Sequence, residues 1–423
     1  MTARTGRDVA VIGAGAVGVI SAIEALCDGH RVTLIDAGEP GGEQAASYGN
    51  AGWLSSHSVI PPSEPGTWKK IPRYLNDPLG PLAIRWSYLP QALPWLVSYL
   101  RSGWSEDRVE RTARALRDLL KDAPVLHGKL AEKAGVGDLI ERRGLLHVFT
   151  ERALFVADPA WSIRKRVGVE WLELSGDDLR RREPALDPRY TFGVLVEEAG
   201  HCRDPGGYVA ALARHAIANG ARIIKARATG LKLEGGRLVA VVTATGEIAC
   251  QAAVIAAGIG SKPLAASIGD RLPLETERGY HVVVEHPETG PRIPVMASDT
   301  KMAVNWMAGG LRAAGQVEIA GLKAAPDWRR ADILHRNLLG MFPALPRPIP
   351  EERLKTWFGH RPSMPDGRPC IGPARACRDV VYAFGHGHVG LVGSARTGRL
   401  VAQLLGGREP EIPLAPFAPA RFL

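Results

Sequence analysis

The first forty residues contain two short, largely apolar segments separated by a longer one in which apolar and small residues recur at helical spacing. Residues 8–13 and 31–35 are the short segments, and residues 17–27 lie between them. A nearly continuous apolar run of this length is typical of a strand that is buried on both faces. The pattern therefore predicts a strand–helix–strand unit, the building block of a parallel sheet.

Further elements follow in the middle and at the end of the chain. Asp204 and Pro205 are typical of a helix N-terminus, and the helix is predicted to end near Asn219, before Gly220. Residues 276–319 alternate in the manner of antiparallel strands. The other predicted elements are strands at 221–224, 238–243, 253–257 and 380–384, and helices within 107–133, 328–339 and 389–405.

Two segments do not fit this alternation. Residues 38–65 are rich in Gly, Ser and Pro and lack periodicity, and so long a loop in a compact domain is usually functional. Residues 79–104 carry three tryptophans among leucines, which favours helices in a core or at a domain interface, with an interfacial membrane helix as the alternative. Because Pro90 and Pro94 interrupt any single long helix, we expect a pair of helices there.

The order of these elements predicts an α/β fold in which one domain is interrupted by another. The nucleotide-type strands and helices fall in three segments. A domain built on an antiparallel sheet, with additional helices, fills the sequence between them. The predicted boundaries assign residues 1–80, 196–262 and 355–423 to the first domain, and residues 81–195 and 263–354 to the second.

Composition narrows the class of protein. The chain of 423 residues is 45% hydrophobic and 23% charged, as in ordinary folded domains. Its net charge of +9 is spread without a block of like charges, so we expect no nucleic-acid partner. The basic balance suits anionic substrates and peripheral contact with an anionic membrane about equally. Five cysteines without paired or metal-ligand spacing predict reduced thiols and no metal site.

The uncharged run at residues 9–23 resembles a signal sequence only superficially. Three glycines interrupt it, Glu24 follows it, and it is too short to span a bilayer. A buried strand and the start of a helix account for the same pattern. The sequence therefore predicts a cytoplasmic protein without a targeting segment.

Gly13, Gly15 and Gly18 match the GxGxxG fingerprint of dinucleotide-binding loops. In such a loop the first glycine permits a tight turn, the second admits the pyrophosphate, and the third lets the helix pack on the strand. The motif joins the first predicted strand to the first predicted helix, and Asp36 ends the second strand, where an acid binds ribose hydroxyls. We therefore expect a dinucleotide at the helix N-terminus, although the fingerprint alone leaves FAD and NAD open.

The remainder of the chain favours FAD. An NAD dehydrogenase would continue with further parallel strand–helix units, whereas here a loop at residues 47–52 follows, and the last such unit lies at the C-terminus. A long cofactor extending through the middle of the protein would contact both ends of the chain. Near the C-terminus, Arg361 precedes a proline, and a loop rich in Gly and His at residues 385–391 precedes the last helix.

Taken in order, these motifs resemble the FAD-dependent D-amino acid dehydrogenases of the glycine oxidase and D-amino acid oxidase superfamily. The resemblance covers nearly the whole chain and implies a Rossmann-like FAD-binding domain with an inserted α+β substrate domain built on an antiparallel sheet. The segments that carry it are the fingerprint with Asp36, residues 50–52 (NAG), 256–258 (AAG), 278–280 (RGY) and 359–391.

The resemblance also implies roles for individual residues. Arg361 matches the arginine that binds the substrate carboxylate, and a planar guanidinium suits bidentate binding of that group. Tyr280 matches a position whose phenol would donate to the carboxylate or close the substrate pocket, with a half-buried structural tyrosine as the alternative. No histidine is assigned a catalytic role. The residues expected to bind FAD are Gly13, Ala14, Gly15, Ala16, Val17, Gly18, Asp36, Ala37, Ser47, Asn50, Ala51, Gly52, Ala228, Ala257, Gly258, Gly385, His386, Gly387, His388, Val389, Gly390 and Leu391.

We expect non-covalent FAD, because residues 358–361 lack the cysteine that carries the flavin in covalent members of the family. The last helix is predicted to begin near Val389, and its N-terminus would direct N–H donors towards the reduced flavin. Such donors stabilise negative charge without a charged side chain.

The implied reaction is oxidative deamination of a D-amino or cyclic imino acid by hydride transfer from Cα to flavin N5, giving an imine or a 2-oxo acid. A glycine/sarcosine-type or D-hydroxyproline-type amine oxidoreductase is one alternative, and a flavoprotein subunit without turnover is another. The resemblance to dehydrogenases favours a quinone or another electron-transfer partner as acceptor. Such a partner would place the cytoplasmic protein at the inner face of the membrane.

Overall fold

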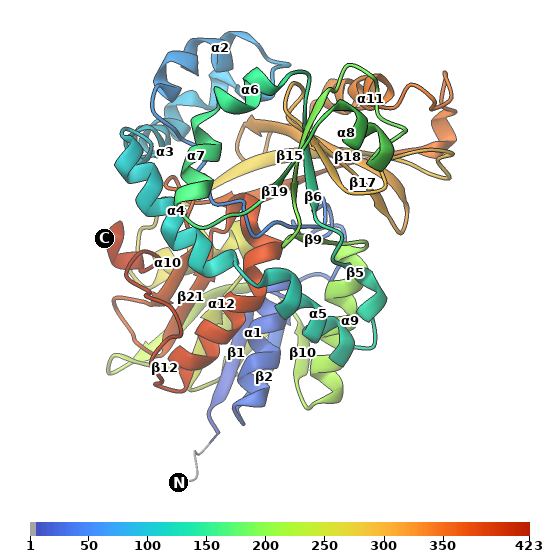
Figure 1. Cartoon of the computed structure of the whole chain (residues 1–423). Coiled ribbons are helices and arrows are strands. Elements are labelled where there is room, and N and C mark those ends of the chain that lie inside the picture. Colours follow the sequence, from blue (N-terminus) through green and yellow to red (C-terminus); the bar gives the residue numbers. More distant parts are fainter. Residues whose placement is uncertain (1–5) are drawn as a thin grey trace.

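Two large β-sheets with helices packed on them divide the structure into two domains (Figure 1). The computed structural model describes residues 6–423. The mostly parallel sheet belongs to the domain in the lower half of Figure 1, which contains both ends of the chain. The mostly antiparallel sheet belongs to the upper domain. A small sheet of three strands connects them, with β3 Trp53–Leu54, β9 Gly200–Cys202 and β5 Ile140–Glu141.

The mostly parallel sheet has the strand order β10-β2-β1-β14-β21-β20, and only β20 is antiparallel to its neighbour. Its strands come from the beginning, the middle and the end of the sequence. They are β1 Asp8–Ile12, β2 Arg31–Asp36, β10 Arg222–Lys225, β14 Ala252–Ile255, β20 Cys370–Pro373 and β21 Val380–Phe384. The predicted Rossmann-like domain with an insertion is therefore confirmed.

Both faces of this sheet are buried, because successive side chains of a strand point to opposite sides. In β1, Val9 and Val11 pack in one core, and Ala10 and Ile12 pack in another. The first core lies under helices, and the second lies against a small antiparallel sheet and a short helix. These elements are α1 Ala16–Cys27, α9 Pro205–Ala218 and α12 Gly390–Leu405 for the first core, and β11 Ala228–Glu234, β12 Arg237–Thr243, β13 Gly246–Ala249 and α10 Ser261–Ser267 for the second.

The helices of this domain begin and pack as local chemistry dictates. In α9 the Asp204 carboxylate accepts a hydrogen bond from the backbone N–H of Gly207 at 2.9 Å, and Gly220, with φ of 98°, follows the helix end. Helices α1 and α12 approach closely at Gly398, where a Cβ would lie 2.7 Å from the side chain of Ile20. The predicted helix termini around Asp204 and Gly220 are thus confirmed.

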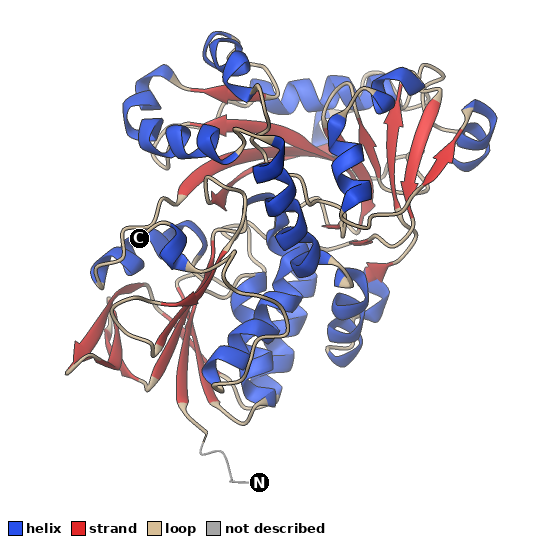
Figure 2. Cartoon of the chain, turned by 60° about the vertical axis from the view of Figure 1, so that its left-hand side comes forward, coloured by secondary structure: helices blue, strands red, loops and turns tan. Residues whose placement is uncertain are grey.

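The second sheet has the order β19-β15-β18-β17-β16-β6-β8-β7, with β4 paired to β18. Its strands, in red, cross the upper part of the molecule in Figure 2. Neighbouring strands are antiparallel except in the pairs β16–β6 and β18–β4. Helix α11 Arg329–Met341 covers one face, where Leu334 and Leu338 share a core with Val282. The strands are β4 Leu82–Ile84, β6 Leu145–Phe149, β7 Leu172–Leu174, β8 Phe192–Val196, β15 Glu275–Val284, β16 Val295–Ala297, β17 Met302–Met307, β18 Gly310–Ile319 and β19 Leu354–Ser363.

Helix α3 Leu89–Ser102 lies at the interface between the domains. The indole of Trp95 donates to the backbone oxygen of Ser363 at 3.1 Å, and the Tyr99 hydroxyl donates to the backbone oxygen of Pro62 at 2.6 Å. The interface position is confirmed, but the predicted helix pair is wrong. Pro90 lies in the first turn, where no N–H is required, and one helix continues past Pro94.

The remaining helices lie around the two sheets. They are α2 Ile71–Asn76, α4 Glu106–Leu120, α5 Ala123–Lys133, α6 Arg152–Val156, α7 Pro159–Arg166 and α8 Gly176–Arg182. Within residues 6–423, no helix is both long enough and apolar enough to cross a membrane.

One predicted boundary differs from the structure. The sequence predicts the end of the second domain at residue 354, whereas β19 continues to Ser363 and pairs with β15 over its full length. Gly359 and Arg361 interrupt the apolar alternation of β19, so its sequence does not have the pattern of a strand in a core. The second sheet therefore extends directly into the C-terminal segment that carries Arg361.

Several histidines are held neutral in the folded protein. Burial lowers the pKa of His127 to about 4 and the pKa of His147, His281 and His386 to about 3. In an unfolded chain a histidine titrates near pH 6.5. Below that pH the unfolded chain binds protons that the folded protein does not bind, so the free energy of unfolding falls as the pH is lowered.

We expect the unfolding temperature to fall steeply between pH 6.5 and pH 4, because each such histidine contributes up to about 1.4 kcal/mol per pH unit. The variant His127→Gln removes one buried group and should make this pH dependence shallower. His215→Gln, on the outer side of α9, is the matched control and should leave it unchanged. Thermal unfolding followed by circular dichroism across this range measures the effect. An identical pH dependence in His127→Gln and the unaltered protein would contradict it.

Candidate active site

The predicted nucleotide loop joins β1 to α1, and its glycines stand where side chains would obstruct the backbone. Gly13 has a φ of 105°, and a Cβ there would lie 2.4 Å from the backbone oxygen of Ala256. A Cβ at Gly18 would lie 1.8 Å from the backbone oxygen of Gly13. At Gly15 a Cβ would meet only the hydroxyl of Ser47, at 3.8 Å. The loop therefore fits a diphosphate at the first turn of α1, where N–H groups lack partners within the helix.

Asp36 lies beside this loop, at the end of β2. Its carboxylate accepts hydrogen bonds from the backbone N–H groups of Ala14 at 2.7 Å and of Gly38 at 2.8 Å. These bonds fix the carboxylate next to the diphosphate position, where a ribose would follow. The structure thus brings Asp36 and the glycine loop together, with Ala37 next in the chain.

The loop at residues 47–52 is held by the second sheet. The Asn50 side chain accepts from the N–H of Gly52 at 2.8 Å, and Arg312 of β18 donates to the backbone oxygen of Asn50 at 2.6 Å. Asn305 of β17 donates to the backbone oxygen of Ala51 at 2.9 Å. The predicted flavin loop is therefore positioned by side chains of the other domain.

Arg312 is a residue of the site that the sequence motifs do not indicate. It lies in β18, and burial lowers its pKa to about 10, so it carries a full positive charge at neutral pH. Its Nε lacks a hydrogen-bond partner among residues 6–423. An arginine among the small and apolar residues of the first half of this strand was the available signal in the sequence.

The C-terminal loop and α12 complete the cofactor side. Gly385 and Gly387 have φ values of 80° and 51°, and α12 begins at Gly390 after a single helical turn at residues 387–389. The His386 ring nitrogen Nε2 lies 3.0 Å from the Thr397 hydroxyl, which itself donates to the helix backbone. Nε2 therefore donates, and the backbone N–H groups at the start of α12 lie beside the loop.

Two further segments that are predicted to bind the cofactor lie close to the nucleotide loop. A Cβ at Gly13 would lie 2.8 Å from the Cα of Ala257, so the segment after β14 lies directly against the nucleotide loop. Gly258 has a φ of 56° there. Ala228 begins β11, two residues after Ala226, whose N–H donates to the backbone oxygen of Asp36 at 2.9 Å. These segments therefore gather along the same edge of the parallel sheet.

Arg361 lies on β19 directly opposite Glu277 of β15. Its guanidinium covers Gly279, where a Cβ would lie 2.1–2.3 Å from the guanidinium atoms. Burial lowers the pKa of Arg361, and the charge of Glu277 opposes that effect. The Nη1 atom is buried and lacks a hydrogen-bond partner among the described residues. Arg361 thus presents an unsatisfied donor of the kind that a carboxylate accepts.

Glu277 lies between Arg361 and the C-terminal loop, and it is also absent from the sequence prediction. The carboxylate is buried and lies 2.9 Å from Nε2 of His388. Burial opposes ionisation, but the charges of His388 and Arg361 outweigh it, so the pKa of Glu277 is lowered. The carboxylate therefore remains ionised and compensates part of the charge of Arg361. It has no local signature, because its role depends on strand register.

Aromatic rings cover the other side of the site. His281 stacks on Trp357 with ring centroids 5.1 Å apart, and its Nδ1 donates to the backbone oxygen of Gly49 at 3.2 Å. Burial, followed by the charge of Arg312, lowers the pKa of His281 to about 3. His281 is therefore neutral and a weak base. A Cβ at Gly49 or at Gly359 would collide with the indole of Trp357, so both glycines are required for this contact.

Tyr280 does not belong to the site, and the prediction that it contacts the substrate is wrong. In β15, Glu277, Gly279 and His281 point to the face that carries Arg361, and Tyr280 points to the opposite face because side chains alternate. Its hydroxyl donates to Glu318 at 2.8 Å and accepts from the N–H of Asp327 at 3.1 Å.

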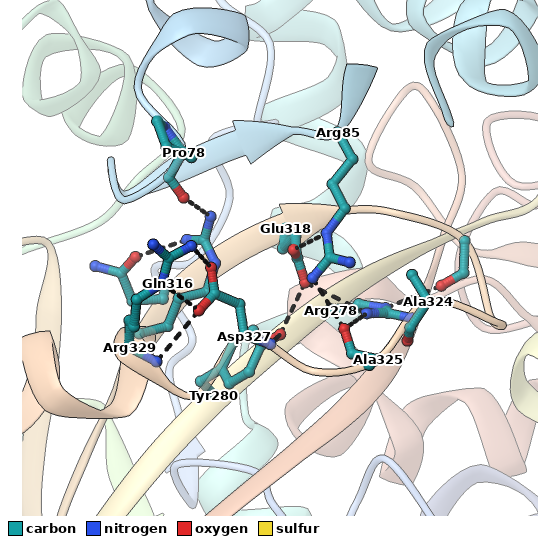
Figure 3. Close-up of polar contacts among 12 residues, drawn as sticks. Pro78, Arg85, Arg278, Tyr280, Gln316, Glu318, Ala324, Ala325, Asp327 and Arg329 are labelled. Carbon is teal, nitrogen blue, oxygen red and sulfur yellow. Dashed lines mark hydrogen bonds and ion pairs between the residues drawn. The ribbon is translucent and has the colours of Figure 1, made fainter. Parts of the chain in front are cut away.

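Figure 3 shows Tyr280 in a polar network with Arg278 and Glu318, and this network lies on the face of the sheet opposite to that of Arg361. Arg85 donates to the same Glu318 carboxylate at 2.6 Å. The network joins β15 and β18 to the segment before α11. Tyr280 is therefore a structural tyrosine, the alternative that the sequence left open.

Residues 8–404 match the family described as FAD dependent oxidoreductase. The chain is 75% identical over 418 residues to a D-amino-acid oxidase of Bradyrhizobium diazoefficiens, with 99% of both chains covered. It is 31% identical to a D-amino acid dehydrogenase of Rhizobium rhizogenes, covering 98% of this chain and 99% of the relative.

A glycine oxidase from Geobacillus kaustophilus has the same fold, with a TM-score of 0.73 and 22% identity, covering 99% of this chain and 100% of the other. The fold, the dinucleotide cradle and these similarities agree over the same length of sequence. The chain therefore belongs to the family of FAD-dependent oxidoreductases.

Proposed function

We propose that the protein catalyses the FAD-dependent oxidative deamination of a D-amino acid. The observation that carries this proposal is Arg361, whose buried Nη1 lacks a hydrogen-bond partner among the described residues and lies beside the two predicted flavin loops. The name of the relative at 75% identity, a D-amino-acid oxidase, supports the same substrate class. Glycine, sarcosine and D-hydroxyproline share the carboxylate that Arg361 would bind, so they remain alternative substrates.

The cofactor would be held along its length by backbone groups. The loop from Gly13 to Gly18 would bind the diphosphate, and Asp36 would bind the adjacent ribose. Residues 47–52 and 385–391 would enclose the isoalloxazine, with the N-terminus of α12 facing its reducible edge. None of these contacts requires a covalent bond, which supports non-covalent FAD.

The chain's own residues would orient the substrate. Arg361 would bind the carboxylate through parallel N–H donors, and Glu277 and Gly279 would keep the guanidinium in place from below. A fixed carboxylate also fixes the position of Cα. Holding the reacting atoms in alignment supplies much of the rate acceleration in reactions of this kind. FAD, when bound, supplies the acceptor for the hydride that leaves Cα.

The buried histidines of the site are poor proton acceptors. His281 and His386 have pKa values of about 3, so neither removes a proton efficiently from a substrate ammonium group near neutral pH. The substrate amine would therefore enter as the neutral form, and the oxidised product, an imine, would hydrolyse to a 2-oxo acid and ammonia.

Oxygen is the acceptor that the similarity at 75% to a protein named an oxidase favours. This proposal replaces the quinone that the sequence predicts. A membrane quinone is the second candidate, favoured by Trp68 and Trp104, which are 54% and 66% exposed and line one surface depression. Lys69 and Lys70 follow Trp68 directly, so the surface combines aromatic and basic side chains as peripheral membrane contacts do.

The variant Gly18→Ala should abolish FAD binding, because its Cβ would collide with the backbone of Gly13 and displace the start of α1. Gly128→Ala is the matched control: it lies in α5 and faces open space, so it should retain the flavin. The visible absorption of the purified proteins measures occupancy, and circular dichroism confirms folding. Full flavin content in Gly18→Ala would refute this cradle.

Replacement of Arg361 by Ala should reduce kcat/KM for the best D-amino acid by at least about 30-fold, since truncating a buried charge-assisted contact costs about 2–5 kcal/mol. Arg361→Lys keeps the charge but loses the planar fork, so we expect an intermediate loss, seen mainly in KM. Lys355→Ala, at the exposed end of the same strand, is the control. A KM unchanged in Arg361→Ala, with flavin retained, would show that another group binds the carboxylate.

In air-saturated buffer the enzyme should release one hydrogen peroxide for each amino acid oxidised. Oxygen uptake and a coupled peroxidase assay measure this ratio. If the enzyme instead reduces a soluble quinone anaerobically faster than it reduces oxygen, and releases no peroxide in air, it is a dehydrogenase.

A further inference from the structure

A second, strongly basic cavity lies away from the active site, between the helices α3 and α4 and the C-terminal end of the chain. It has a volume of about 440 Å³. In Figure 1 these two helices and the C-terminus lie on the same side of the molecule. The side chains and backbone that line the cavity belong to Ser98, Arg101, Ser102, Arg108, Arg111, Thr112, Asp366, Arg368, Arg421 and Phe422.

Two helices supply matching sets of polar groups to this cavity. On α3, Arg101 lies one turn after Ser98, and on α4, Arg111 and Thr112 lie one turn after Arg108. Residues three and four apart share one helix face, so each helix directs guanidinium and hydroxyl donors into the same space. The Arg108 side chain donates to the backbone oxygen of Arg101 at 2.8 Å, which fixes the two sets relative to each other.

The opposite wall is rigid. The Asp366 carboxylate accepts hydrogen bonds from Nε of Arg421 at 2.9 Å and from Nη2 of Arg368 at 2.7 Å. Arg421 also donates to the backbone oxygen of Phe417 at 2.6 Å. Ser102 connects this wall to α3 by its hydroxyl, 3.1 Å from the backbone oxygen of Pro365. This wall is therefore held in place by ion pairs and hydrogen bonds within the protein, whereas Arg101, Arg108 and Arg111 on the other side of the cavity are exposed.

The charges of the cavity are not balanced by the protein. Five arginines line it with one carboxylate, and that carboxylate is shared by Arg368 and Arg421. For Arg101, Arg108 and Arg111 the described part of the chain provides no ion pair. Solvent ions screen the repulsion between neighbouring arginines only partly, because the Debye length in physiological salt is about 8 Å.

We propose that this cavity binds a small polyanion, a molecule with at least two phosphate or carboxylate groups. Guanidinium groups bind both oxyanions through parallel N–H donors, and the volume is within the range of small-molecule sites. Arg101, Arg108 and Arg111 would contact the anion directly, with Arg368 at the opposite wall. The bound molecule would connect α3 and α4 to the turn that follows β19, and so stabilise the contact between the domains.

The test uses the FAD-loaded protein and measures its unfolding temperature at constant ionic strength. Pyrophosphate should raise this temperature saturably, with half of the effect below about 1 mM, whereas chloride should not. ATP and citrate are then compared as a nucleotide phosphate and a polycarboxylate. The one that raises the unfolding temperature at the lower concentration identifies which kind of oxyanion the cavity binds. Calorimetric titration of the same protein with pyrophosphate should give one bound pyrophosphate per chain.

Arg111→Gln and Arg101→Gln should each weaken pyrophosphate binding at least tenfold, and Arg336→Gln, on α11 far from the cavity, should leave it unchanged. Both substituted arginines are exposed, and kcat with the amino acid substrate should stay the same, which confirms intact folding and separates this site from the active site. The proposal fails if no polyanion shifts the unfolding temperature. It also fails if the shift persists in a variant that combines Arg101→Gln with Arg111→Gln, because the anion would then bind elsewhere, for example at the diphosphate position of FAD.

Discussion

The placement of the Arg361 guanidinium group, with its buried Nη1, over the neighbouring strand β15 is the constraint on which the rest of the site depends. An uncompensated buried charge is costly, so Arg361 needs both a counter-charge and space. The register of β15 and β19 provides both, with Glu277 opposite the arginine and Gly279 beneath it. A shift of one residue would turn Glu277 to the other face and bring Arg278 or Tyr280 under the guanidinium. The polar network behind the sheet therefore maintains the site without touching it.

The two domains depend on each other through the loops that lie between them. Arg312 and Asn305 of the second sheet hold the loop at residues 47–52, and Ser363 of β19 pairs with His386 of the C-terminal loop. The second sheet thus holds loops that are predicted to contact FAD, and the segment with Arg361 leads directly into the first domain. Rigid connections of this kind favour precise placement of substrate and cofactor over large movements of one domain against the other.

Features with a local cause could be predicted from the sequence. The glycine fingerprint, the helix start at Asp204 and the strand at residues 380–384 each depend on neighbouring residues, and the structure confirms them. Glu277 and Arg312 could not be found in this way, because their roles arise from strands paired across long distances in the sequence.

The error at Tyr280 has the same origin. A motif of arginine, glycine and tyrosine identifies the strand, but it does not say which of its two faces meets the substrate. The extent of β19 was missed because Gly359 and Arg361 serve the site and so break the apolar alternation that marks a strand.

The interrupted order of the parallel sheet has a consequence for biosynthesis. Val9 pairs with Ala252, and Ala253 pairs with Val380, so the central strands meet only after most of the chain has been made. Contacts between residues so far apart form slowly, because long loops must close first. Strand β14 therefore keeps one unpaired edge until β21 has been made. Because the segments predicted to bind FAD come from both ends of the chain, FAD would stabilise the complete chain and not a truncated one.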